Sequence, residues 1–237
     1  MNELLRTAIA TSSKLNAEAL TQLRQDGFCV VPGPFPPRAM SSLVSAYDRA
    51  MVEADPGERR VGRTTVRVND LINRGPEFDS IYLYPPLLDA CWQILGRPFK
   101  LSVLHGRTLL PERPAQEWHV DYPPDTLGWT MVGFIFMIDE FRKENGATSF
   151  LRGSHLLAAS HEPDSPVATA CGGAGSMILY NGSAWHGHGS NTTRESRRSV
   201  QGAFIRREAP SSMDWPNRIR PDTLERLGPL ARFLLAL

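Results

Sequence analysis

Residues 117–121, Glu117-Trp118-His119-Val120-Asp121, place an imidazole and a carboxylate two positions apart. On a β-strand, side chains at positions i and i+2 project from the same face, so His119 and Asp121 can reach one point in space. Such a pair is half of a metal site and needs a second imidazole from elsewhere in the chain. The segment 184–188 (AWHGH) offers one in His186. Two histidines and one carboxylate that leave other positions open are typical of non-haem Fe(II) oxygenases, and we interpret the three residues as an Fe(II) site.

The overall composition is that of an ordinary globular protein. The 237 residues include 41% hydrophobic and 22% charged ones, which favours a single domain with a sizeable core. The net charge of +1 gives no field that would attract nucleic acid or an anionic membrane, so we expect neither as a partner.

The cysteines and the N-terminal residues bear on the compartment. Three cysteines lie far apart without a CxxC pair, which argues against a disulfide framework and a zinc knuckle and favours a reducing compartment. Residues 1–20 contain no uninterrupted apolar run, so we expect neither a signal peptide nor a membrane span. We therefore expect a cytoplasmic protein.

Hydrophobic spacing predicts helices first and strands afterwards. Residues 16–25, 40–51 and 85–95 carry apolar positions at helical spacing, with a short strand expected at 28–31. From residue 99 onward, short strand-like runs alternate with Gly, Pro and Asn turns. Residues 129–138 are mostly apolar at both odd and even positions, which suits a strand that is buried on both faces. These patterns predict a mainly β sandwich or jelly roll with flanking α-helices packed outside.

The segment 185–198 (WHGHGSNTTRESRR) extends the metal pattern. Asn191 and Arg197 follow His186 by five and eleven positions, and HxD…H-x4-N-x5-R resembles the phytanoyl-CoA dioxygenase (PhyH) family of Fe(II)/2-oxoglutarate oxygenases. Residues 136–155 (FMIDEFRKENGATSFLRGSH) are similar to the family's apolar strand, Asn-Gly turn and Gly-Ser-His turn. The resemblance covers roughly residues 23–205 and includes a strand at 175–180 (GSMILY) that leads toward the second histidine.

The resemblance implies a double-stranded β-helix, or cupin-like jelly roll, forming a single dioxygenase domain over residues 1–237. N-terminal helices within residues 1–98 would pack on a jelly-roll core at 99–207, followed by a C-terminal helical tail at 208–237. The implied cofactors are Fe(II), 2-oxoglutarate as cosubstrate, and O2. The implied reaction hydroxylates or otherwise oxidises a C–H bond of a small-molecule substrate, as in natural-product metabolism, and releases succinate and CO2. We expect a monomer or a homodimer.

The resemblance also assigns residues to the cosubstrate. Arg197 has the spacing expected for the residue that binds the far carboxylate, since a planar guanidinium can pair with it bidentately. The adjacent Arg198 is the alternative, because neighbours on a strand face opposite ways. His188 stands where the family usually has serine, and it could donate a hydrogen bond to the cosubstrate, meet the substrate, or have a structural role.

Four residues are candidates for contacts with the substrate. Arg107 precedes the metal pair, Tyr122 and Trp129 flank the loop after Asp121, and Arg63 lies in the arginine-rich segment 59–67. That segment is either a solvated charged face or a mobile cover that selects a polar or anionic group. The remaining histidines, His105, His155 and His161, are expected to be structural or surface residues.

Other functions would use part of this pattern. A cupin metal site would need a glutamate where Thr192 and Thr193 stand, and a related halogenase would have Gly or Ala in place of Asp121. A zinc-dependent hydrolase could use the same three ligands to activate a water molecule. A non-catalytic jelly-roll binding protein would need no chemistry at all. The last two stay open, although neither accounts for both Asn191 and Arg197.

Overall fold

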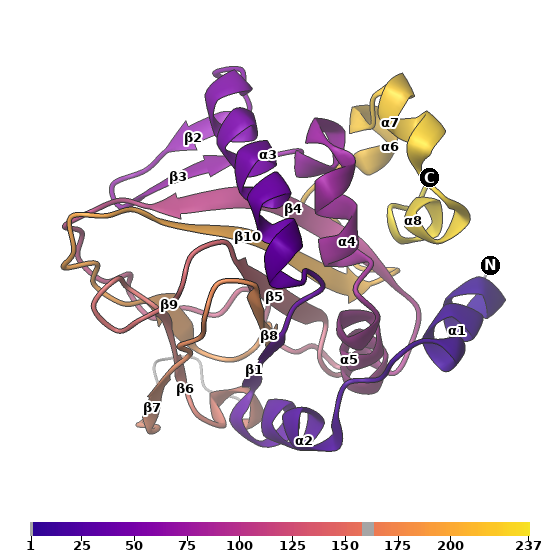
Figure 1. Cartoon of the computed structure of the whole chain (residues 1–237). Helices are drawn as coiled ribbons and strands as arrows, with labels where there is room; N and C mark the ends of the chain where they lie inside the picture. Colours follow the sequence, from indigo (N-terminus) through magenta and orange to yellow (C-terminus); the bar gives the residue numbers. More distant parts are fainter. Residues whose placement is uncertain (1, 158–163) are drawn as a thin grey trace.

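Two antiparallel sheets form the centre of the protein, in a computed structural model that describes residues 2–157 and 164–237. The large sheet has the strand order β1-β8-β5-β10-β4-β3-β2, and the small sheet has the order β7-β6-β9 (Figure 1). The strands are β1 (Phe28–Pro32), β2 (Arg59–Val61), β3 (Thr65–Val68), β4 (Phe99–Leu109), β5 (Met131–Met137), β6 (Thr148–Leu151), β7 (Val167–Thr169), β8 (Ser176–Asn181), β9 (His186–His188) and β10 (Arg197–Arg206).

Helices cover the face of the large sheet that points away from the small one. Figure 1 shows α3, α4 and α5 in front of this sheet, and α1 and α8 beside each other near the two termini. The helices are α1 (Asn2–Thr11), α2 (Ala17–Asp26), α3 (Met40–Glu53), α4 (Asp79–Tyr82), α5 (Pro85–Leu95), α6 (Trp215–Arg218), α7 (Pro221–Arg226) and α8 (Pro229–Leu234), with 3-10 turns η1 (Pro37–Ala39), η2 (Leu71–Arg74), η3 (Pro76–Phe78) and η4 (Ser154–Leu156).

The ends of the predicted helices follow local chemistry. The side chain of Asn16 accepts a 2.7 Å hydrogen bond from the backbone N–H of Ala19, which caps the start of α2. Gly27 ends the same helix with φ of 87°, a conformation that glycine adopts at little cost. Helix α5 likewise begins at Pro85, and Gly96, with φ of 64°, follows its last residue. The sequence predictions for these two helices are confirmed.

The large sheet is buried on both faces by two separate clusters of apolar side chains. On β5 every residue is buried, as the sequence predicts: Phe134 and Phe136 pack toward the helices, whereas Ile135 and Met137 pack toward the small sheet. The second cluster reaches Phe150 on β6, so it joins the two sheets. This arrangement confirms the mainly β jelly-roll fold with flanking helices, and it leaves a space between the sheets where a site can form.

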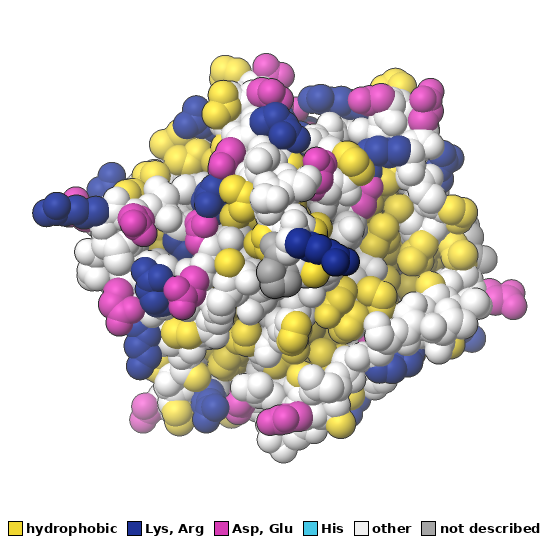
Figure 2. Space-filling model, viewed as in Figure 1, with side chains coloured by type: hydrophobic (Ala, Val, Ile, Leu, Met, Phe, Trp, Pro, Cys, Tyr) yellow, Lys and Arg dark blue, Asp and Glu magenta, His cyan; other side chains and the backbone are white. Residues whose placement is uncertain are grey.

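The arginine-rich segment 59–67 is part of the large sheet. It forms the hairpin of β2 and β3, and β3 pairs with β4 so that Arg67 lies opposite Arg107. On the face that Figure 2 shows, basic and acidic side chains are mixed, in keeping with the net charge of +1. Among the described residues, no helix combines the length and the apolar character needed to cross a membrane.

Candidate metal centre and its cavity

His119, Asp121 and His186 meet at the wall of a cavity between the two sheets. The Nε2 atom of His119 lies 3.7 Å from Oδ1 of Asp121, and Nε2 of His186 lies 3.5 Å from Oδ2 of the same carboxylate. One ligand atom from each residue lies within 4.8 Å of the other two. Since metal bonds to nitrogen and oxygen are about 2.0–2.2 Å long, three atoms at such spacings can bind one ion after a small movement.

The backbone holds the two histidines side by side, with ring centres 4.4 Å apart. His119 and His186 form an antiparallel bridge, with N–H to O distances of 3.1 and 2.9 Å. The Nδ1 atom of His119 lies 3.1 Å from the carbonyl oxygen of Glu117, and Nδ1 of His186 lies 2.9 Å from that of Ala184. A proton on each Nδ1 satisfies these carbonyls and leaves Nε2 free, which is the tautomer that a metal ion requires.

Tyr180 on β8 is a direct partner of the metal-site carboxylate. Its hydroxyl donates a 2.6 Å hydrogen bond to Oδ2 of Asp121. Burial acts to raise the pKa of Asp121, but His186, the hydrogen bond from Tyr180 and His119 together lower that pKa below its ordinary value. The carboxylate is therefore ionised at neutral pH. The Tyr180 ring fits only because residue 133 is glycine: a Cβ there would lie 2.2 Å from the ring.

Burial also keeps the neighbouring imidazoles neutral. It lowers the pKa of His186, and it lowers the pKa of His188 to about 4. The Nδ1 atom of His188 lies 2.8 Å from the carbonyl oxygen of Gly189, while its Nε2 lies 3.2 Å from the Thr64 hydroxyl. In this arrangement Nδ1 donates and Nε2 accepts. The ring then has no proton to donate into the cavity.

Arg197 points into the same cavity without a partner for most of its guanidinium. Its side chain is buried (3% exposed), and the guanidinium carbon lies 3.7 Å from the centre of the Phe141 ring. Its Nε and Nη1 atoms have no hydrogen-bond partner among the described residues. Burial, followed by the charge of Arg107, lowers the pKa of Arg197 to about 9. A buried cation without an acceptor is costly, so this position is suited to a carboxylate ligand.

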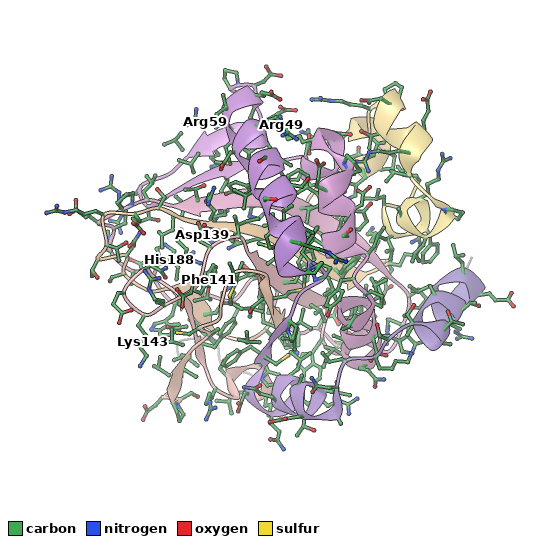
Figure 3. The ribbon with its side chains drawn as sticks, in the orientation of Figure 1. Arg49, Arg59, Asp139, Phe141, Lys143 and His188 are labelled. Carbon is green, nitrogen blue, oxygen red and sulfur yellow. The ribbon has the colours of Figure 1, made fainter. Side chains whose placement is uncertain are left out.

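Arg198 faces the opposite side of β10. Its guanidinium donates to both carboxylate oxygens of Asp139 and of Asp48, outside the cavity. Figure 3 labels Asp139 together with His188 and Phe141 below β10. Of the two adjacent arginines, the structure therefore brings Arg197 to the candidate site.

The cavity has a volume of about 390 Å³ and a mixed wall. Two of the four substrate-side candidates, Arg107 and Tyr122, line it. Arg63 does not, because it lies in the exposed turn between β2 and β3. Trp129 does not either: its ring packs 5.5 Å, centre to centre, from that of His155.

The other three histidines lie in different parts of the chain, and one of them lines the cavity. His105 lines the cavity from β4, and burial followed by the charge of Arg67 lowers its pKa to about 3. His155 is buried, and its Nε2 lies 3.0 Å from the carbonyl oxygen of Arg24, in keeping with a structural role. His161 lies outside the described residues.

Several polar residues on the cavity wall are not among the predicted site residues, including Tyr180, Gln116 and Gln201. The sequence indicates Arg67 only as part of the arginine-rich segment 59–67, and it too lies on the wall. For Arg67 a signal exists, because Thr65-Val66-Arg67-Val68 alternates like a strand with β-branched residues on either side of the arginine. No such sequence pattern points to Gln116 or Gln201.

Two comparisons of the sequence with known proteins both match dioxygenases. The family model described as phytanoyl-CoA dioxygenase (PhyH) matches residues 23–199. The chain is 30% identical over 207 residues to the dioxygenase trt7 of Aspergillus terreus, covering 79% of this chain and 72% of that protein.

Solved structures share the fold at lower identity. The epimerase SnoN in complex with Fe3+, alpha ketoglutarate and nogalamycin RO superposes with a TM-score of 0.71 at 17% identity, covering 91% of each chain. HygX from Streptomyces hygroscopicus, with nickel, 2-oxoglutarate and hygromycin B bound, gives a TM-score of 0.66 at 19% identity, covering 83% of this chain and 90% of that one. These likenesses establish the fold.

Proposed function

The chain belongs to the phytanoyl-CoA dioxygenase (PhyH) family, and we propose that it is an Fe(II)- and 2-oxoglutarate-dependent oxygenase acting on a small molecule. It would hydroxylate, or otherwise oxidise, a C–H bond of its substrate and release succinate and CO2. The observation that carries the proposal is one cavity that contains both the cluster of His119, Asp121 and His186 and the buried guanidinium of Arg197, whose Nε and Nη1 have no partner among the described residues.

The residues present fit the metal and the cosubstrate. Two imidazoles and an ionised carboxylate are ligands that suit Fe(II), with positions left over for exchangeable ligands. Arg197 offers a buried, bidentate partner for the far carboxylate of 2-oxoglutarate, and Phe141 packs against its guanidinium. When bound, Fe(II) and 2-oxoglutarate would supply the activation of O2 and the oxidising power for C–H cleavage.

The protein's own contribution is orientation and exclusion of water. Tyr180 fixes the carboxylate of Asp121, and the carbonyls of Glu117 and Ala184 fix the two imidazole rings. His119 and Asp121 are partly exposed at the cavity wall, so a bound cosubstrate and substrate would exclude water from the site. His188 stays a candidate for contact with the cosubstrate, although in its present arrangement the ring accepts a hydrogen bond from Thr64.

Several findings support a small-molecule substrate. SnoN and HygX have small molecules bound, nogalamycin RO and hygromycin B, and the cavity volume of about 390 Å³ is within the usual range for such ligands. A role in natural-product metabolism, a cytoplasmic location and a monomeric or homodimeric state remain predictions from the sequence. Arg63 and Trp129 are not retained among the proposed substrate contacts, whereas Arg107 and Tyr122 are.

A zinc-dependent hydrolase is less well supported. It would use the same three ligands but would leave the guanidinium of Arg197 buried without a function. A non-catalytic binding protein would have no use for an ionised carboxylate that lies 3.7 and 3.5 Å from the Nε2 atoms of two histidines.

Succinate formation from 2-oxoglutarate tests the proposal. We expect the wild-type protein to release succinate slowly without any substrate, in a reaction that needs both Fe(II) and O2. His186→Ala should abolish the release, whereas Arg198→Gln, on the opposite side of β10, should retain it. No succinate above background from the wild-type protein would contradict the proposal, as would an equal rate with Zn(II) under nitrogen.

A further inference from the structure

A β-bulge at Ser102 attaches the C-terminal segment to the sheet beside the cavity. The pairing of β4 with β10 passes from Val103 to Leu101 and skips Ser102. A bulged residue leaves the ladder, so its polar groups can bond elsewhere. The carbonyl oxygen of Ser102 accepts a 3.0 Å hydrogen bond from the backbone N–H of Met213, and its Oγ accepts one of 2.9 Å from that of Ser212. The bulge therefore determines where residues 211–213 lie.

Two further contacts hold the same segment in place. The indole Nε1 of the buried Trp215 donates a 2.8 Å hydrogen bond to the carbonyl oxygen of Leu101. Arg218 forms an ion pair with Asp70, a buried residue that follows Asn69 on the cavity wall. The C-terminal segment is thus bound both to β4 and to the chain that leaves β3, and it forms a fixed part of the wall.

Met213 separates the site cavity from a second pocket. Its side chain lines the cavity of about 390 Å³ that contains the metal centre, and it also lines a neighbouring pocket of about 290 Å³. The second pocket includes Leu101, Trp215 and Leu235 in its wall. Met213 is partly buried against the apolar cluster on the helix side of the large sheet. Since methionine is unbranched and flexible, this partition can adapt to a ligand.

Strand pairing places the metal centre and the bulge along one row of the sheet. Tyr180, which donates to Asp121, lies opposite Gly133 on β5. Gly133 lies opposite Ala203 on β10, and Ala203 lies opposite Val103 next to the bulge. Three interstrand spacings separate the ends of this row, a distance of about 14 Å. The row leads from the partner of a metal ligand toward the C-terminal segment.

The proposed cosubstrate residue lies toward the other end of the cavity. Arg197 is opposite Leu109, which is six residues along β4 from Val103, or about 20 Å of extended strand. Figure 1 likewise shows the C-terminal helices on the side of the molecule away from β9. The end of the cavity at Met213 is therefore left for the substrate. The wall there is mixed, because Asn69 and Ser212 line it as well.

We propose that Met213 is a specificity-determining residue, which limits how far the substrate can extend from the metal centre. Shortening its side chain would join the cavity to the second pocket and admit a longer molecule. This inference rests on the proposed function, because it concerns the substrate that shares the cavity with 2-oxoglutarate. Ser102 is the positioning residue, since its bulge holds Met213 at the cavity wall.

Calorimetric titration with a graded series of neutral probes tests the inference. The protein is loaded with Zn(II), which is redox-inert, and 2-oxoglutarate, and is then titrated with straight-chain alcohols from 1-butanol to 1-decanol. We expect the affinity of the wild-type protein to rise about three- to fourfold with each buried methylene group, and to stop rising at the chain length that reaches Met213.

Variants at position 213 should move this limit in opposite directions. In Met213→Ala the affinity should go on rising for about two further methylene groups, whereas in Met213→Trp it should stop rising about two groups earlier. Both variants should keep the wild-type affinity for 2-oxoglutarate, which shows that they are folded. The matched control is Met40→Ala, because Met40 lines a different pocket beside β1, and its loss should leave the limit unchanged.

Two results would overturn the inference: the limit falls at the same chain length in the wild-type protein and both variants, or no alcohol of the series binds. A wild-type protein that does not bind 2-oxoglutarate in the loading step would contradict the proposed function itself, and this inference with it.

Discussion

The hydroxyl of Tyr180 lies 2.6 Å from Oδ2 of Asp121 and donates a hydrogen bond to the carboxylate that stands between the two site histidines. The bond joins β8 of the large sheet to the loop that follows His119, so the metal centre is tied to both sides of the cavity. Burial and the nearby charge of Asp121 raise the pKa of Tyr180 well above its ordinary value, so the tyrosine stays protonated and keeps donating.

Removing this hydrogen bond should weaken metal binding. We expect Tyr180→Phe to lower the affinity for Fe(II) by about 10- to 100-fold, because the carboxylate loses the partner that orients it. The measurement is an anaerobic Fe(II) titration. Tyr84→Phe is the control, since its hydroxyl donates to the carbonyl of Pro32 outside the site. Unchanged affinity in Tyr180→Phe would show that the bond does not position Asp121.

A methyl group at position 133 should displace the same tyrosine. Gly133→Ala would place a Cβ 2.2 Å from the Tyr180 ring, so the ring has to move away from Asp121. We expect a loss of about 1–3 kcal/mol in the free energy of unfolding, together with weaker metal binding. Urea denaturation measures the first effect. The control is Gly57→Ala, where a Cβ meets nothing within 4 Å; this variant should change neither the free energy of unfolding nor metal binding.

His105 should make the protein less stable in mild acid. Its pKa is about 3 in the fold and 6.5 in the unfolded chain, so the unfolded chain binds a proton first as the pH falls below 6.5. The free energy of unfolding should then fall by up to about 1.4 kcal/mol per pH unit from this residue alone, down to a pH near 3. Urea denaturation of the wild-type protein and of His105→Gln at pH 7 and pH 5 checks this. The difference between the two pH values should be smaller in the variant, and equal differences would contradict the prediction.

Phe141 should affect the cosubstrate rather than the metal. Its ring packs 3.7 Å from the guanidinium carbon of Arg197, and a desolvated contact of this kind contributes about 1–2 kcal/mol. We expect Phe141→Leu to weaken 2-oxoglutarate binding by roughly 5- to 30-fold and to leave Fe(II) binding unchanged. Calorimetry with Zn(II)-loaded protein measures the binding of 2-oxoglutarate, and an anaerobic Fe(II) titration measures the binding of the metal. A loss confined to Fe(II) binding would contradict the role given to Phe141.

The family, the jelly-roll fold and the dioxygenase class follow from sequence because their signals are local or regularly spaced. His119 and Asp121 are two positions apart on one extended segment, and His186 is marked by Asn191 and Arg197 after it. The alternating and continuous apolar runs likewise determine which segments become strands. These predictions are confirmed by the fold and by the comparisons.

The remaining features depend on strand pairing, which no local pattern specifies. Whether Arg197 or Arg198 enters the cavity depends on the face of β10 that turns inward. Tyr180 reaches Asp121 only because the pairing of β5 with β8 places Gly133 opposite it. Arg67 lies opposite Arg107 only because β3 pairs with β4 in one particular register. The arginine-rich composition of residues 59–67 alone suggests a solvated face.

The most direct test of the account is an anaerobic titration of the protein with Fe(II) and 2-oxoglutarate, followed by the metal-to-ligand charge-transfer absorption band of the complex. We expect the band in the wild-type protein, its loss in Asp121→Ala, and a large shift to higher 2-oxoglutarate concentration in Arg197→Gln with Fe(II) binding retained. A wild-type protein that binds Fe(II) but develops no such band would contradict the claim that these three ligands and one buried arginine hold the metal and the cosubstrate together.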